Sequence, residues 1–296
     1  MTRQPSSTPT VASFRHESTG TWTYVVADPA TRAAAVVDPV LDYDWRSGRT
    51  GTAAADAVAA HCEAAGLDVQ WILETHAHAD HLSSAPCLQA RLGGRIAIGA
   101  GIRGVQATFK RIFGLGADFT PDGGQFDRLL QDGDSLEIGA LRGQVIAVPG
   151  HTSDSVAYLF GDALFVGDTV FMPDGGSARC DFPGGDAAEL YRSVQRLYAL
   201  PADTRVFVCH DYCPGGREPR CETTVREQRA ANIHVRDGVS EQEFVAMRRK
   251  RDATLDVPNL LIPSVQVNIR AGRLPPADAD GVSYLRVPLN VIGRPL

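Results

Sequence analysis

The segment Thr75-His76-Ala77-His78-Ala79-Asp80-His81 decides how the rest of the chain is interpreted. It follows the largely apolar residues 69–73, a run that predicts a buried strand, so the polar residues fall on the loop after that strand. Three imidazoles and a carboxylate so close together would repel one another if protonated, and each would need a partner if buried. A metal ion satisfies all of them, and Zn²⁺, Fe²⁺ or Mn²⁺ suit such ligands. A solvated histidine-rich loop is the weaker hypothesis.

The composition is that of a globular protein. The chain has 296 residues, of which 44% are hydrophobic and 22% charged, with a net charge of −6. The acidic balance argues against nucleic acid or an anionic membrane as the main partner. The polar start predicts a disordered tail over residues 1–10 without a secretory signal, and no apolar run reaches transmembrane length. We therefore expect a cytoplasmic protein whose scattered cysteines are reduced thiols.

Periodicity and turn signals predict alternating strands and helices, that is, an α/β fold. The predicted strands are 21–27 and 33–37 as a hairpin, 69–73, 95–98, 141–148, 156–160 and 163–166 as a second hairpin, and 205–209. Two helices are predicted over residues 52–65 and 83–92. A helix and a surface loop within 101–127 are expected to overhang a site. Two further helices are predicted to begin at capping boxes, one formed by Asp186 and Glu189 and the other by Ser240 and Glu243. From Pro258 onward the chain is expected to be extended.

Metal-type ligands follow other predicted strands as well. His151 comes after Pro149-Gly150, Asp168 after Gly167, and His210 after the strand 205–209. Each alone is explained as well by a turn or a satisfied core histidine. Strand-end loops collect at one edge of an α/β sheet, however, so four such loops together predict a single metal site.

The order His-x-His-x-Asp-His, Gly-His-Thr, Gly-Asp-Thr and a strand that ends in His resembles the metallo-β-lactamase superfamily over residues 11–215. The resemblance implies an αββα sandwich with the metal site at one edge. It also implies a catalytic domain over residues 11–235 and a C-terminal extension, residues 236–296, packed on the same domain.

Within that superfamily, the sequence resembles the persulfide dioxygenases more than the glyoxalase II-like hydrolases. The features that carry this are Arg179-Cys180-Asp181-Phe182, His210-Asp211-Tyr212, the stretch 222–229 and the C-terminal motif from Pro263 to Gly272. The longer loops at 172–178 and 213–221 resemble the bacterial β-lactamase hydrolase-like sulfur dioxygenases. The chain departs from the family pattern at Cys180, where Thr is usual, and at Asp154, a carboxylate close behind Gly-His-Thr.

The resemblance implies that His76, His151 and Asp168 hold one Fe(II) per chain, with zinc as the replacement in recombinant protein. This is an open two-histidine, one-carboxylate site of the kind used with O₂. His78, Asp80, His81 and His210 would orient these ligands or hold a second metal.

The implied reaction oxidises glutathione persulfide with O₂ to sulfite and glutathione. Arg179, Asp181, Tyr212 and Arg229 are the substrate-binding candidates, although Arg229 lies on a predicted helix and suits a solvated face equally well. The alternative enzyme is a dizinc hydrolase of glutathione thioesters, and a sulfide or redox sensor ranks below both. A homodimer is compatible with the resemblance, but no sequence feature indicates one.

Overall fold

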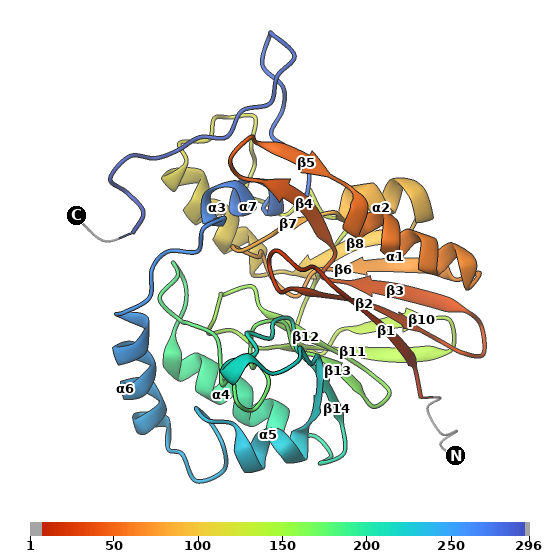
Figure 1. Ribbon diagram of the computed structural model, residues 1–296. Helices are drawn as coiled ribbons and strands as arrows, with labels where there is room; N and C mark the ends of the chain where they lie inside the picture. Colours follow the sequence, from red (N-terminus) through yellow and green to blue (C-terminus); the bar gives the residue numbers. More distant parts are fainter. Residues whose placement is uncertain (1–7, 294–296) are drawn as a thin grey trace.

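The computed structural model describes residues 8–293, and its core is a pair of β-sheets packed face to face (Figure 1). The first sheet has the order β1-β2-β3-β6-β8-β9, with β1 (Thr10–Arg15), β2 (Trp22–Ala27), β3 (Ala33–Val37), β6 (Asp68–Leu73), β8 (Arg95–Gly99) and β9 (Arg128–Leu130). The second has the order β10-β11-β12-β13-β14-β15, with β10 (Ser135–Ile138), β11 (Leu141–Ala147), β12 (Val156–Phe160), β13 (Ala163–Phe165), β14 (Arg205–Phe207) and β15 (Glu222–Thr224). A small sheet joins β4 (Val40–Asp44), β5 (Arg49–Gly51) and β7 (Leu82–Ser83).

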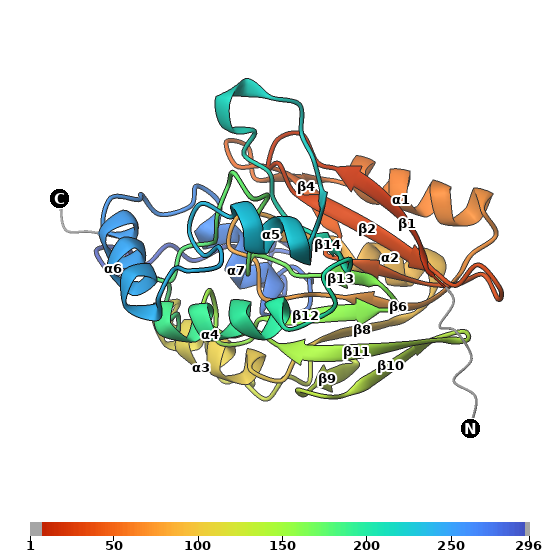
Figure 2. The same ribbon diagram turned by 90° about the horizontal axis from the view of Figure 1, so that it is seen from below.

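Helices cover the outer face of each sheet, which gives the four layers of an αββα sandwich (Figures 1 and 2). The helices on the first sheet are α1 (Ala53–Ala64), α2 (Ala85–Leu92) and α3 (Ile102–Ile112), with α7 (Leu261–Asn268) beside β7. Those on the second are α4 (Ala187–Tyr198), α5 (Val225–Ala231) and α6 (Glu241–Asp252), of which α6 packs on α4, and a 3₁₀ turn, η1 (Pro214–Gly216), lies in the loop before β15. The α/β sandwich expected from the sequence is confirmed. No helix in the described range is long and apolar enough to cross a membrane.

The alternation of side chains along the strands builds the layers. In β2, Val25 packs under the first helical layer, while Tyr24 and Val26 point into the core between the sheets. In β6, Ile72 faces the helices and Leu73 faces the other sheet. Because successive residues of a strand point to opposite faces, a run that is apolar at every position marks a strand covered on both sides.

The predicted strands and helices up to residue 252 form close to their expected positions, including both hairpins. Three expectations need correction. The expected tail reaches too far, since β1 begins at Thr10, and residues 1–7 lie outside the described range. The segment 101–127 forms α3 but packs on the outer face of the first sheet and does not overhang the metal-side cavity.

The third correction concerns the residues after Pro258, which were expected to be extended. They contain α7, with Pro263 in its first turn. Proline is tolerated there because the first backbone N–H groups of a helix have no intrahelical acceptor. The domain boundary at residue 235 stays a prediction.

Candidate metal centre

The four ligand-bearing loops all follow strands, namely β6, β11, β13 and β14. Strands β11 and β13 are both antiparallel to β12, and β13 is parallel to β14, so these three run in one direction. Their following loops therefore emerge at one edge of the second sheet, carrying His151, Asp168 and His210. Strand β6 of the first sheet delivers residues 76–81 to the same edge, because these side chains contact one another.

Glycine immediately before two of the ligands permits the sharp turns of these loops. Gly150 has a φ of +136°, and a Cβ at this position would lie 2.2 Å from the backbone nitrogen of Leu190. Gly167 has a φ of +51°, and a Cβ there would lie 2.5 Å from Oγ1 of Thr75. A side chain at either position would push apart the elements that bring His151 and Asp168 to the site.

A first cluster joins His76, His151 and Asp168, whose donor atoms lie within 4.8 Å of one another. Oδ2 of Asp168 is 3.6 Å from Nε2 of His151 and 3.9 Å from Nε2 of His76. Atoms bound to one ion at about 2.1 Å lie roughly 3.0–3.5 Å apart, so only a small contraction separates these side chains from a metal-bound arrangement. The Nδ1–H of His151 donates to the carbonyl of Arg179 (2.7 Å), which leaves Nε2 free for a metal.

A second cluster joins His78, Asp80, His81 and His210, also within 4.8 Å. Nε2 of His210 lies 3.1 Å from Oδ2 of Asp80 and 3.5 Å from Oδ1 of Asp168. Nδ1 of His81 lies 3.6 Å from Oδ1 of Asp80. Asp168 therefore lies between the two clusters, in contact with both.

The donor atoms fit a metal because they are buried without other partners. Nε2 of His76, Nδ1 of His78, Nε2 of His81 and Oδ1 of Asp168 have no hydrogen-bond partner among the described residues. Burial, aided by the neighbouring imidazoles, holds the pKa values of His76 and His78 well below the usual value, so both rings are neutral and able to ligate. Such a group of unsatisfied donors is costly unless a cation is bound.

Residues outside the ligand motif hold the loop in place. The amide of Asn268, from the C-terminal motif, donates to the carbonyls of His78 and His81 (both 2.8 Å). Asp154 accepts from the N–H of Ala77 (2.9 Å), so this additional carboxylate fixes the loop backbone and makes no hydrogen bond to a ligand imidazole among the described residues.

Sequence reasoning missed Asp38, which lies at the start of a turn after β3. Its buried carboxylate accepts from the N–H of Thr75 (2.7 Å) and lies 3.0 Å from Nε2 of His78. The available signal was the Asp-Pro pair at a strand end, a position where the other loops carry ligands. Cys209 was also missed, and its sulfur lies within 4.8 Å of donor atoms of Asp38 and His78. Burial raises the pKa of this thiol well above the usual value.

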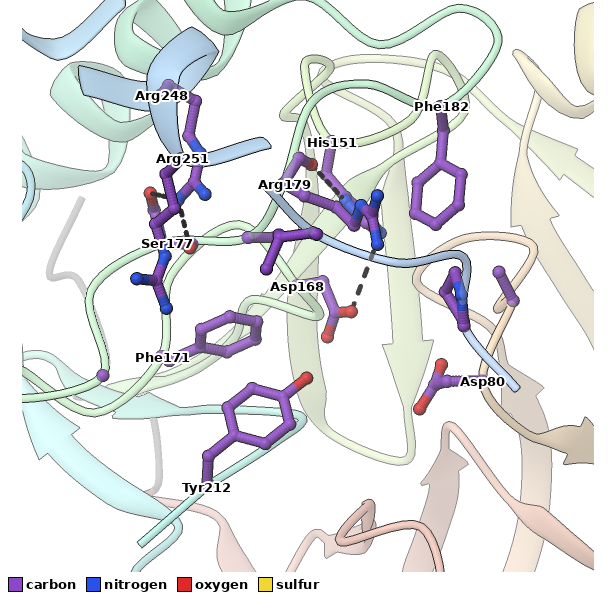
Figure 3. A pocket seen from close by; sticks show the side chains of 15 residues that line it. Asp80, His151, Asp168, Phe171, Ser177, Arg179, Phe182, Tyr212, Arg248 and Arg251 are labelled. Atoms are coloured by element: carbon purple, nitrogen blue, oxygen red, sulfur yellow. Dashed lines mark hydrogen bonds and ion pairs between the residues drawn. The ribbon is translucent and has the colours of Figure 1, made fainter. Parts of the chain in front are cut away.

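A cavity of about 390 Å³ opens beside the first cluster (Figure 3). Asp80, His151 and Asp168 lie on one side of it, and its apolar walls include Phe171, Phe182, Leu255 and Pro258. Figure 3 shows the hydroxyl of Tyr212 pointing toward Asp168. The cavity therefore combines a metal-type donor set with partly apolar walls.

Three arginines line this cavity, and they differ in their partners. Arg179 forms a bidentate pair with Asp181 (2.6 and 2.7 Å), and Arg248 pairs with Asp252 (2.7 Å). The guanidinium of Arg251 makes no hydrogen bond or ion pair with any residue in the range 8–293. Among the three lining arginines, Arg251 is therefore the one whose positive charge can pair with a bound anion.

The structure brings together most, but not all, of the residues predicted from the sequence. Arg179 and Tyr212 line the cavity, whereas Asp181 faces a neighbouring cavity and contributes as the partner of Arg179. The prediction for Arg229 needs correction, because this residue lies on α5, is paired with Asp237 (3.0 Å) and does not line the cavity. Cys180, at the position where Thr is usual, is buried, and burial raises the pKa of its thiol.

Comparisons with known proteins support this description. Residues 18–210 match the family model described as the metallo-beta-lactamase superfamily. A protein named "Probable metallo-hydrolase" from Burkholderia pseudomallei is 51% identical over 293 residues, covering 96% of this chain and 100% of its own. The mitochondrial persulfide dioxygenase ETHE1 of Homo sapiens is 30% identical over 255 residues, which cover 85% of this chain and 84% of that protein. The crystal structure of ETHE1 from Myxococcus xanthus superposes with a TM-score of 0.71 at 29% identity, covering 89% of this chain and 100% of that one.

Proposed function

Because the chain belongs to the metallo-β-lactamase superfamily, we propose that it is a persulfide dioxygenase with one ferrous ion per chain. Glutathione persulfide, O₂ and water would give glutathione and sulfite. The observation that carries the proposal is the first cluster, in which two histidines and one carboxylate converge beside an open cavity. This donor set is typical of non-haem Fe(II) oxygenases.

His76, His151 and Asp168 would hold the ion through Nε2, Nε2 and a carboxylate oxygen. When bound, ferrous iron would supply the redox chemistry that lets an anionic sulfur react with O₂ in its vicinity. Phe171 and Phe182 would exclude water around the sulfur. His210 Nε2, 3.1 Å from Asp80, is the atom at which a proton released from the substrate would be held. Burial lowers the pKa of His210, but the negative charges of Asp80 and Asp168 outweigh this effect, so the pKa is raised above its usual value.

The remainder of the substrate is anionic, since glutathione carries carboxylates. Arg179 and Arg248 are already paired with carboxylates of this chain. Arg251 therefore becomes the cation that would bind a substrate carboxylate at the cavity, because charge-assisted guanidinium–carboxylate contacts orient such ligands. Tyr212 would add a hydroxyl near the reacting end.

A second candidate, a dizinc hydrolase of glutathione thioesters, is favoured by one observation. The second cluster offers a complete further ligand set, with Asp168 placed to bridge two ions. The name of the 51% identical relative also points to a hydrolase. In this case the two clusters would hold two zinc ions, which would supply a nucleophile for thioester hydrolysis by lowering the pKa of water to about 7.

The two candidates are separated by purifying the protein under anaerobic conditions and measuring its metal content and its reactions. One iron per chain together with O₂ consumption on adding glutathione persulfide supports the dioxygenase. Two zinc ions per chain, cleavage of S-lactoylglutathione and no O₂ consumption would replace it with the hydrolase.

A further inference from the structure

The segment 177–180 carries the backbone carbonyl that orients a ligand of the first cluster, yet it belongs to no helix or strand. The carbonyl of Arg179 accepts from Nδ1–H of His151 (2.7 Å). A carbonyl can only accept, so this contact selects the tautomer in which Nε2 is free to bind a metal. The position of the segment therefore decides which nitrogen of His151 faces the first cluster.

Side chains of α6 hold this segment on both sides of Arg179, and Figure 3 shows one of them, Arg248, beside Ser177. Arg248 Nη1 donates to the carbonyl of Ser177 (3.0 Å), and Asp252 Oδ2 accepts from the N–H of Cys180 (2.9 Å). The other oxygen of Asp252 accepts from Nε and Nη2 of Arg248 (3.0 and 2.7 Å). The two side chains thus form one unit whose contacts bracket the carbonyl of Arg179.

The burial of this pair is unusual for a purely supporting contact. Arg248 is 1% exposed and Asp252 is 5% exposed. A buried ion pair has a high desolvation cost and stabilises a fold little more than an apolar pair would, so its use here indicates a positional role. Helix α6 also lies beyond residue 210, where the match to the family model ends.

We propose that Arg248 and Asp252 are positioning residues for the metal centre. They act through the segment 177–180 and the carbonyl of Arg179 to fix the Nδ1–H tautomer and the orientation of His151. The helix after the family core would then set metal affinity at the first cluster. This inference rests on the first cluster binding a metal as proposed, but not on the oxidation of a persulfide.

The test uses the double variant Arg248→Gln/Asp252→Asn of the full chain, because it removes both charges and leaves neither buried alone. Cobalt(II) is the probe, since its visible absorption reports its ligands, and affinity is measured by competition with a chelator. Loss of an interaction that orients a ligand typically weakens metal binding about 10–100-fold. We expect a loss in that range and a changed cobalt spectrum, with the metal-free variant still folded by circular dichroism.

The control is Glu241→Gln, which breaks the exposed pair between α6 and Arg192 of α4 (3.1 Å) without touching the segment 177–180. Its cobalt affinity should equal that of the wild type. Nitrogen-15 NMR of histidine-labelled metal-free protein gives an independent measurement, in which His151 should be a Nδ1–H tautomer in the wild type and a mixture in the double variant. Unchanged affinity, spectrum and tautomer in the folded double variant would overturn the proposal.

If the double variant does not fold, Arg248→Lys decides instead. A lysine has a single nitrogen and cannot reproduce the fork of contacts to Asp252 and Ser177. An intermediate loss of cobalt affinity supports the proposal, and wild-type affinity refutes it. Because no readout depends on turnover, these results remain interpretable even if the wild-type protein consumes no O₂.

Discussion

Nε2 of His78 lies 3.0 Å from Oδ1 of Asp38, and the other ring nitrogen of His78 is buried without a hydrogen-bond partner among the described residues. The same carboxylate accepts from the N–H and the hydroxyl of Thr75 (2.7 and 2.9 Å). A carboxylate behind an imidazole raises its basicity and fixes its orientation toward a metal. Asp38 therefore controls both the backbone and a side chain of the ligand loop.

The substitution Asp38→Asn should weaken metal binding about 10–100-fold, because the amide cannot supply the charge-assisted contact to His78. Chelator competition monitored by metal content measures the change. Asp44→Asn, which alters the exposed last residue of β4, bonded to Ser47, is the matched control and should bind metal normally. Equal affinities for a folded Asp38→Asn and the wild type would show that the contact has no role in metal binding.

The division of the donors into two clusters predicts different outcomes for their substitution. Under the proposed single-iron site, Asp168→Ala or His76→Ala should abolish both iron content and O₂ uptake, since each removes one of three ligands. His81→Ala should keep one iron per chain with slower O₂ uptake. Iron analysis alongside an oxygen electrode measures both quantities.

His61→Ala serves as the control for these histidine substitutions, because His61 lies on α1, packs edge-on against Phe14 and belongs to neither cluster. It should retain full iron content. The assignment of three ligands would be abandoned if Asp168→Ala kept wild-type O₂ uptake, or if His81→Ala lost all its metal.

The residues of the two clusters could be predicted from the sequence because each lies in a loop that follows a strand, and four of them fall between residues 76 and 81. Residues that support the site from distant parts of the sequence could not be predicted in this way. Asp38 precedes the ligand loop by a whole helix, α1, and as an Asp before Pro it is equally typical of an ordinary turn. Arg248 and Asp252 lie in a charged stretch of α6 that suits a solvated helix face, and only the packing of α6 shows that both are buried.

Two predictions were wrong for the same physical reason: the effect of a residue depends on its position within a helix. The chain from Pro258 onward was expected to be extended, whereas Pro263 lies in the first turn of α7, where a proline interrupts no hydrogen bond. Arg229 was selected for its charge near a family motif, but α5 turns it toward Asp237. Charge alone therefore did not identify Arg251, the arginine that we propose binds the substrate, whereas the contacts of each arginine did.

Arg251→Gln should raise the KM for glutathione persulfide about 5–10-fold while kcat stays close to wild type. One charge-assisted contact at a solvent-accessible mouth contributes about 1 kcal/mol, and its loss affects bound substrate and transition state alike. Steady-state O₂ consumption over a range of persulfide concentrations gives both constants.

Arg229→Gln is the matched control for this experiment, because it removes the same kind of charge outside the cavity and should leave KM unchanged. Cysteamine persulfide, which has no carboxylate, should show equal KM values with the wild type and Arg251→Gln. If Arg229→Gln raised KM and Arg251→Gln did not, the substrate would lie elsewhere than in this cavity.

The stability of the fold should fall as the pH drops from about 7 to 5, partly through His234. Nδ1 of His234 accepts from the N–H of Ser177 (2.9 Å), and burial beside Arg248 and Arg251 lowers the pKa of this ring to about 4. In the unfolded chain a histidine has a pKa of about 6.5, so between these values the unfolded state binds the additional proton. The free energy of unfolding therefore decreases as the pH falls through this range.

The contribution of His234 should be about 1 kcal/mol between about pH 7 and pH 5, after allowance for the partial exposure of the ring. His234→Asn keeps an oxygen that can accept from Ser177 but cannot titrate, so its unfolding free energy should approach that of the wild type as the pH is lowered. Urea unfolding of the metal-free proteins at several pH values measures the difference in unfolding free energy between the two chains. The histidines of the two clusters are present in both chains, so their contributions cancel in this difference. A difference that stays constant with pH would mean that His234 is protonated to the same extent in the folded and unfolded states, contrary to its buried contact with Ser177.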